Sequence, residues 1–139
     1  SYKPVYEYRE VWAEESGALN ANSAEWSFGN GAVGFIGLPI DAGWEIIQQG
    51  FQADTYASLS AVSIDAMTYS SPTPGNAVAN VLTTITLTDA RDGGGDTNNA
   101  WKIETIDPVA VPEGVIGFHT RDLTGAISDA RVYLRLRRQ

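Results

Sequence analysis

The chain contains no cysteine, one histidine and one methionine among its 139 residues. Without cysteine there is no disulfide framework, no thiolate ligand for a metal and no thiol nucleophile. The single histidine, His119, stands in an apolar stretch typical of a strand, without the second histidine or cysteine that zinc binding would require. Acidic pairs such as Glu14 and Glu15 lie near the N-terminus, where a glycosidase cleft is not expected. We therefore expect no enzyme, no catalytic residue, no metal site and no cofactor.

Positive charge is also scarce. Nine Lys and Arg residues against 17 Asp and Glu residues give a net charge of −8. This balance argues against non-specific nucleic-acid binding and favours solubility or a basic partner surface. No stretch approaches the roughly 18 apolar residues of a membrane span, and the first residues lack the apolar core of a signal peptide. We expect neither nucleic-acid nor membrane partners.

The charges are unevenly distributed along the chain. Residues 1–69 hold nine acidic residues against Lys3 and Arg9, whereas four arginines crowd the last nine residues: Arg131, Arg135, Arg137 and Arg138. Two interpretations remain open. The basic strand could lie near the acidic half of a neighbouring subunit and steer assembly, or it could be a solvated strand face.

Apolar residues recur with a period of two almost everywhere, which predicts strands. We expect strands at residues 5–13, 44–53 (with a bulge at Gly50), 59–69, 81–88, 101–106, 115–120 and 130–137. Turn residues separate them, among other places at 107–108, 112–114 and 124–125. This pattern predicts an all-β fold, an antiparallel β-sandwich or jelly-roll-like domain over residues 16–139, preceded by an N-terminal arm or first strand at residues 1–15.

The last strand shows the alternation most clearly, with Ala130, Val132, Leu134 and Leu136 on one face and arginines on the other. An apolar face opposite a charged one is typical of a half-buried antiparallel strand. We expect an inner face built from the following six residues: Val62, Ile64, Ile85, Leu87, Val132 and Leu134.

Glycines at positions 29, 31 and 34 match the G-x-G-x-x-G pattern of dinucleotide-binding loops. That chemistry needs a helix after the third glycine, and here Gly37 and Pro39 stand where it would run. We expect instead a structural corner between two β segments, formed by Gly29, Gly31, Gly34 and Gly37. At least one of Gly29, Gly31 and Gly34 should have positive φ or a close backbone contact.

Large aromatic residues crowd the N-terminal segment. It carries Tyr2, Tyr6, Tyr8 and Trp12, with Val5 and Val11 on its other face. Two apolar faces would expose more hydrophobic surface than a soluble monomer usually does, so we expect this segment to pack against a neighbouring subunit or a capsid. The predicted subunit or capsid interface consists of Tyr2, Tyr6, Tyr8, Trp12, Arg135 and Arg137. Across the chain, core packing, subunit contacts or a carbohydrate platform are alternative roles for the large aromatic residues: Trp12, Trp26, Trp44, Trp101, Tyr2, Tyr6, Tyr8, Tyr56, Tyr69 and Tyr133.

Acidic residues Asp89, Asp92 and Asp96 surround three glycines in residues 89–99. Such a loop could hold Ca²⁺, although the spacing departs from that of an EF-hand. A solvated hairpin tip is the favoured interpretation.

Residues 17–31, which end in Trp-Ser-Phe-Gly-Asn-Gly, and the Ile-Gly-Leu-Pro turn at 36–39 form a distinctive pattern. It resembles a module of tailed-bacteriophage fibre and capsid-decoration proteins, and residues 115–120 and 128–132 resemble its closing strands. The likeness covers about residues 16–135. It implies a virion structural protein, assembled in the host cytoplasm, that acts as a capsid-decoration (cement) or head-fibre subunit.

The implied partners are further copies of the chain, for which capsid and fibre symmetry favours a homotrimer, and the major capsid protein or other virion proteins. The alternative is the tip of a tail fibre, a receptor-binding module that recognises a glycan or protein on the host surface.

Overall fold

The computed structural model describes residues 3–18, 24–26, 37–70, 79–87 and 100–139, and all of its regular elements are strands. The all-β prediction is therefore confirmed. The strands are β1 (Glu7–Ala18), β2 (Ala24–Glu25), β3 (Gly37–Ile40), β4 (Glu45–Tyr69), β5 (Ala79–Leu87), β6 (Ala100–Ala110) and β7 (Gly114–Arg138).

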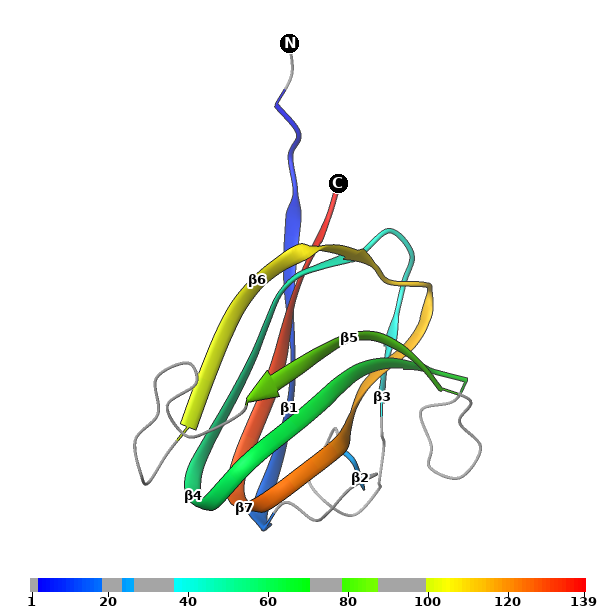
Figure 1. Ribbon diagram of the computed structural model, residues 1–139. Helices are drawn as coiled ribbons and strands as arrows, with labels where there is room; N and C mark the ends of the chain where they lie inside the picture. The colour runs from blue at the N-terminus through cyan, green and yellow to red at the C-terminus, as the bar shows by residue number, and fades with distance from the viewer. Residues whose placement is uncertain (1–2, 19–23, 27–36, 71–78, 88–99) are drawn as a thin grey trace.

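The two 25-residue strands β4 and β7 pair with each other in antiparallel fashion and organise the whole fold. Both strands bend sharply at the end of the molecule opposite the two termini (Figure 1), and there the β4–β7 register shifts between Ala57 and Ala61. Each long strand therefore contributes to two layers. The first sheet has the strand order β1-β7-β4-β6. In the second sheet β2 and β3 each pair with β7, β7 pairs with β4, and β4 pairs with β5. The fold is a β-sandwich.

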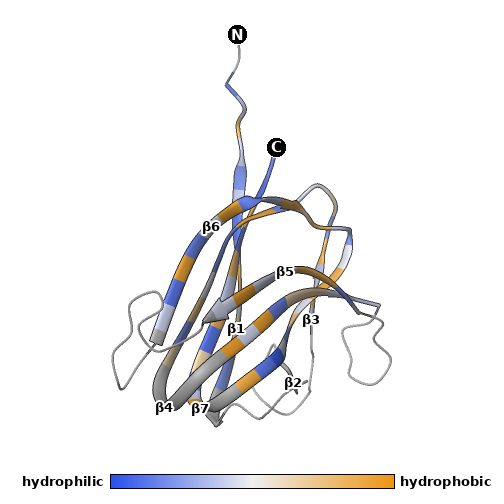
Figure 2. Cartoon of the chain, viewed as in Figure 1, coloured by the Kyte–Doolittle hydropathy of each residue, from blue (hydrophilic) through white to orange (hydrophobic). Residues whose placement is uncertain are grey.

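The core lies between these two sheets. The inner face combines apolar residues from both halves of β4 and β7, and hydrophobic and hydrophilic residues alternate along strands such as β6 (Figure 2). Five of the six predicted inner residues are buried: Val62, Ile64, Ile85, Val132 and Leu134. The side chain of Leu87 lies outside the described residues. The inner-face prediction is confirmed for the other five.

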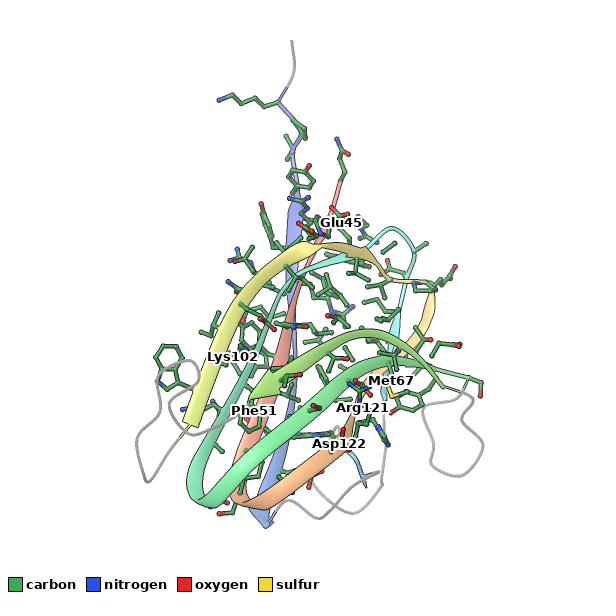
Figure 3. All side chains as sticks on the ribbon, viewed as in Figure 1. Glu45, Phe51, Met67, Lys102, Arg121 and Asp122 are labelled. Atoms are coloured by element: carbon green, nitrogen blue, oxygen red, sulfur yellow. The ribbon has the colours of Figure 1, made fainter. Side chains whose placement is uncertain are left out.

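A polar seam closes the side of the sandwich between the edge strands β5 and β6. Gln49, only 2% exposed, donates from Nε2 to the Thr84 carbonyl oxygen (2.9 Å) and to Glu104, and its Oε1 accepts from Thr83 Oγ1 (2.8 Å). From β6 (Figure 3), Lys102 Nζ donates to the Thr86 carbonyl oxygen over 2.8 Å. These bonds satisfy buried polar groups and connect the two layers.

Two predicted turns and one predicted bulge are wrong. Residues 107–108 lie within β6. Residues 124–125 lie within β7 at the place where it bends from one sheet into the other, so no loop separates two strands there. β6 is an edge strand, so it can contain Pro108, which has no backbone N–H to donate. Opposite Asp107 and Pro108 the pairing with β4 shifts register between Ile46 and Gln48, so β6 has more residues than β4 at this point. The register runs without a break through Gly50, so this glycine is not a bulge.

The N-terminal segment is a strand of the sandwich from Glu7 onward. β1 crosses the predicted boundary between residues 15 and 16 and pairs with β7, with Val11 opposite Leu134. Val11 is buried in the chain's own core. Val11 therefore needs no neighbouring subunit to cover it, whereas packing of the segment as a whole against a subunit or capsid stays a prediction. Residues 3–6 precede the strand and extend past the body (Figure 1), with Val5 84% exposed.

Candidate binding face on the first sheet

The outer face of the first sheet carries a row of residues in register across all four strands. Trp12 of β1 is opposite Tyr133 of β7, Tyr133 is opposite Gly50 of β4, and Gly50 is opposite Ile103 of β6. Because side chains of paired residues lie on the same face of a sheet, this register gathers large apolar side chains on the solvent side.

Tyr133 is the fixed centre of this row. Its ring packs over Gly50, where an added Cβ would lie 1.9 Å from Tyr133 Cε1, and it stacks on Trp12 with centroids 4.7 Å apart and planes at 21°. Its hydroxyl donates to Gln48 Oε1 over 2.8 Å. Gly50, Trp12 and Gln48 together therefore hold the side chain of Tyr133 in place. Burial also raises the pKa of Tyr133 above its usual range, and nearby Glu10 raises it further.

Beside Tyr133 the face is hollowed into a pocket of about 240 Å³. We call it the aromatic pocket; its lining includes Trp12, Gln52, Trp101, Ile103, Arg131 and Tyr133. Trp12, Trp101 and Ile103 are 42%, 44% and 55% exposed, so their apolar surfaces face solvent. Such exposure of large apolar side chains around a concavity is typical of binding sites.

One charged pair borders this pocket. The Arg131 guanidinium lies over the Trp12 ring, 5.7 Å from its centroid, and its Nη2 is 2.9 Å from Glu14 Oε1. The charge of the arginine is thus balanced by a carboxylate on the neighbouring strand.

A second group of side chains lies further toward the N-terminal end of β1. Arg135 lies over the Tyr8 ring (4.7 Å) and Arg137 over the Tyr6 ring (4.6 Å), and the two tyrosine rings are 6.4 Å apart. We call these four residues the aromatic–arginine stack. Arg137 also donates from Nε to Glu45 Oε1 over 2.6 Å. Cation–π contacts of this kind contribute about 0.5–1 kcal/mol each at exposed sites.

The acidic N-terminal half and the basic last strand meet within this chain. Arg138 lies between Glu7 Oε1 (2.7 Å) and Asp41 Oδ2 (2.6 Å), with its guanidinium 4.4 Å from the Trp44 ring. Hydrogen bonds from Arg138 and from the Trp44 indole lower the pKa of Asp41 to about 2.

The antiparallel pairing of β1 with β7 explains these contacts, because it places the start of the chain beside its end. Arg131, Arg137 and Arg138 form their ion pairs inside one chain, so these charges have acidic partners without a neighbouring subunit. The expectation that the basic strand face lies near a neighbour's acidic half stays a prediction.

The structure brings five of the six predicted interface residues onto one face: Tyr6, Tyr8, Trp12, Arg135 and Arg137. Tyr2 lies outside the described residues. Sequence reasoning noted Trp101 and Tyr133 only among the general aromatic candidates. It did not identify Gly50 and Ile103 as part of the binding face, because their place beside Tyr133 depends on strand register. The alternation of Gln48, Gly50 and Gln52 was the local signal that these three residues share the solvent face.

Of the predicted glycine corner, only Gly37 lies within the described residues; Gly29, Gly31 and Gly34 lie outside them, as does the loop at 89–99. Gly37 belongs to β3 and packs closely on β7. A Cβ there would be 2.4 Å from Val115 Cγ1 and 3.0 Å from the Ile116 carbonyl oxygen. Gly37 is thus a glycine whose missing side chain lets two strands approach closely. The expectation of positive φ or a close backbone contact at Gly29, Gly31 or Gly34 stays a prediction.

The outer face of the second sheet carries a buried carboxylate. Asp65, 2% exposed, accepts from Thr84 Oγ1 over 2.6 Å and lies 3.4 Å from Arg121 Nη2. Met67, two positions along β4 from Asp65, forms a small apolar cluster with Tyr69. Across the described parts of the chain, no three His, Asp or Glu side chains gather as a metal would require, and no helix is long and apolar enough to span a membrane.

No protein-family model matches this chain, and no curated protein matches its sequence. Similar solved structures include the SPBc2 prophage-derived protein YomS, at 8% identity over 97% of this chain and 98% of that one, with a TM-score of 0.37. The cyanophage Pam1 capsid asymmetric unit matches at 12% identity over 100% and 91%, with a TM-score of 0.43. The globular domain of the zebrafish complement 1qA protein matches at 8% identity over 92% and 94%, with a TM-score of 0.44. Phage proteins thus occur among these structures beside a complement domain, and likenesses this distant identify no function.

Proposed function

We propose that this chain is a structural protein of a tailed-phage virion, a capsid-decoration or head-fibre subunit that acts without catalysis. The proposal joins two observations. The sequence of residues 17–31 resembles virion modules of this kind. The exposed aromatic–arginine stack on the first sheet is the structural feature that carries the proposal, because it offers a surface suited to contact with other virion proteins.

The chemistry of the stack suits a protein interface. Tyrosine and arginine are enriched among the residues that dominate binding energy at interfaces. Tyr8 is 53% exposed, so its ring retains surface that a partner can bury. Arg135 and Arg137 are already aligned on tyrosine rings, and Glu45 fixes the second of them. Pre-ordered side chains lose less conformational entropy on association, which favours binding.

The proposed assembly is a homotrimer bound to the major capsid protein or another virion protein. In a three-fold ring each contact joins two different patches, so the stack of one subunit would meet another surface of the next. The projecting residues 3–5, which directly precede Tyr6 of the stack, lie where they can extend that contact.

The experiment assembles phage particles from the structural genes of the genome that encodes this protein. The protein is supplied as the wild type, as a double variant or as a control variant. The double variant Tyr8→Ala/Arg135→Ala removes both members of one ring–guanidinium pair. Val81→Ala is the matched control, because Val81 is 52% exposed on β5 of the other sheet. We expect native mass spectrometry to detect trimers, and particle sedimentation to retain the wild type and the control but not the double variant.

Urea unfolding of the three forms separates a lost contact from a lost fold. A wild-type chain that is monomeric and that does not sediment with particles would overturn the proposal. So would a folded double variant that is incorporated as well as the wild type.

One observation favours a second function, a tail-fibre tip that recognises a host surface glycan. It is the aromatic pocket, whose exposed indole groups surround a small concavity. Host-cell binding by the isolated protein, with no binding to capsids, would favour this second function.

A further inference from the structure

We propose that the aromatic pocket binds one neutral pyranose ring of a glycan. This inference does not depend on the decoration or head-fibre role; it rests on the second function proposed above and names the ligand class of the same pocket. The pocket centres on Trp12 and Tyr133, four positions along β1 and β7 from the pair formed by Tyr8 and Arg137. At about 3.3 Å per residue, that separation is roughly 13 Å, so a sugar and a protein partner could occupy the face together.

The size of the pocket limits the ligand. Sites for drug-sized molecules usually measure about 300–1,000 Å³. A volume of about 240 Å³ is below that range and suits a single six-membered ring. Its position on a solvent-facing sheet leaves the rest of an oligosaccharide free to extend into water.

The walls of the pocket match the apolar face of a sugar ring. Trp12 and Trp101 reach it from β1 and β6, at opposite edges of the sheet, and both remain close to half exposed. A pyranose presents a face of C–H groups that an aromatic ring can cover, while its hydroxyls point outward. Aromatic side chains provide large contact areas at low conformational cost, which suits a ligand with little apolar surface.

The polar groups at the rim favour a neutral sugar. Gln52 offers both a donor and an acceptor, as sugar hydroxyls require. Arg131 would attract a carboxylate if its charge were unbalanced, but Glu14 lies 2.9 Å from it. A uronate or sialate would therefore meet a carboxylate beside the guanidinium, whereas neutral hydroxyls can bond to both members of the pair.

The site is preorganised. Tyr133 is confined by Gly50, by the Trp12 ring and by its hydrogen bond to Gln48, and all of these residues lie on paired strands. A site on a rigid sheet loses little freedom when it binds, so even a small ligand can be held.

The test uses saturation-transfer NMR and tryptophan fluorescence with the full chain. The probes are methyl glucoside, methyl galactoside and N-acetylglucosamine, each up to about 50 mM, which covers millimolar dissociation constants. Sodium glucuronate tests the charge argument, and a tyrosine-containing tripeptide tests the alternative that the pocket receives a protein side chain. We expect at least one neutral sugar to bind, with transfer strongest at its ring C–H protons.

Two pocket variants and one control complete the design. Trp101→Ala and Gln52→Ala should each weaken binding about tenfold or more, whereas Val81→Ala on the other sheet should leave it unchanged. Trp101 is 44% exposed on an edge strand, so its loss should preserve the fold; particle incorporation is scored separately. The proposal fails if no neutral sugar binds, if glucuronate or the peptide binds more tightly, or if the folded Trp101→Ala protein binds as the wild type does.

Discussion

The ring of Tyr133 occupies the space that a side chain at Gly50 would need, since a Cβ there would lie 1.9 Å from Tyr133 Cε1. Glycine usually weakens a strand, because it adds backbone entropy to the unfolded chain and has no side chain to pack. Here it lets the aromatic ring of Tyr133 on β7 lie over β4. The ring in turn supports Trp12, so the outer face of the first sheet depends on the absence of a side chain in β4.

Gly50→Ala should destabilise the protein by about 1–3 kcal/mol, because the methyl group displaces the Tyr133 ring. In a Tyr133→Ala background the same change should cost much less, since the conflicting ring is gone. Urea unfolding of the four proteins in this double-mutant cycle measures the coupling. Equal costs in both backgrounds would contradict the contact.

Leu134→Ala should cost roughly 2–5 kcal/mol of unfolding free energy, because Leu134 is fully buried and its truncation leaves a cavity. Arg135→Ala, one position along on the solvent face, should cost no more than about 1 kcal/mol. Chemical denaturation of the two variants compares neighbouring positions on opposite faces. A larger loss for Arg135→Ala would refute the register of β7.

Acid should weaken the contact between Asp41 and Arg138. The pKa of Asp41 falls from its ordinary 3.8 to about 2 in the folded chain. A carboxyl whose folded pKa is lowered contributes stability that is fully present above about pH 4 and is lost as the pH falls toward 2. Asp41→Asn should therefore have a flatter stability profile between pH 4 and pH 2, measured by thermal unfolding. Parallel profiles for variant and wild type would contradict this assignment.

Removing residues 1–5 should leave the fold intact, because β1 begins at Glu7 and Val5 is 84% exposed. Removing residues 1–12 should lower the unfolding midpoint sharply, since it deletes Val11 from the core and exposes the edge of β7. Circular dichroism melting curves distinguish the two truncations. If the longer truncation melts like the full chain, β1 is not an integral strand of the sandwich.

Which face of a strand is buried could be predicted from the sequence, because side chains alternate locally with a period of two. That rule correctly placed Leu134 inside and Arg135 outside. It also brought the tyrosines and arginines into one predicted interface set. The resemblance of residues 17–31 to virion modules likewise belongs to the sequence alone.

Which strands become neighbours was decided by the tertiary structure. Thr124 and Gly125 have the composition of a turn, yet β7 runs through them, because each long strand is paired along both of its halves. Tyr133 and its hydrogen-bond partner Gln48 lie 85 residues apart, and no local pattern predicts that one will face the other. Register is set by packing over the whole sandwich, whereas alternation is set by the geometry of each residue. The aromatic pocket depends on register, so it could be recognised only in the folded chain.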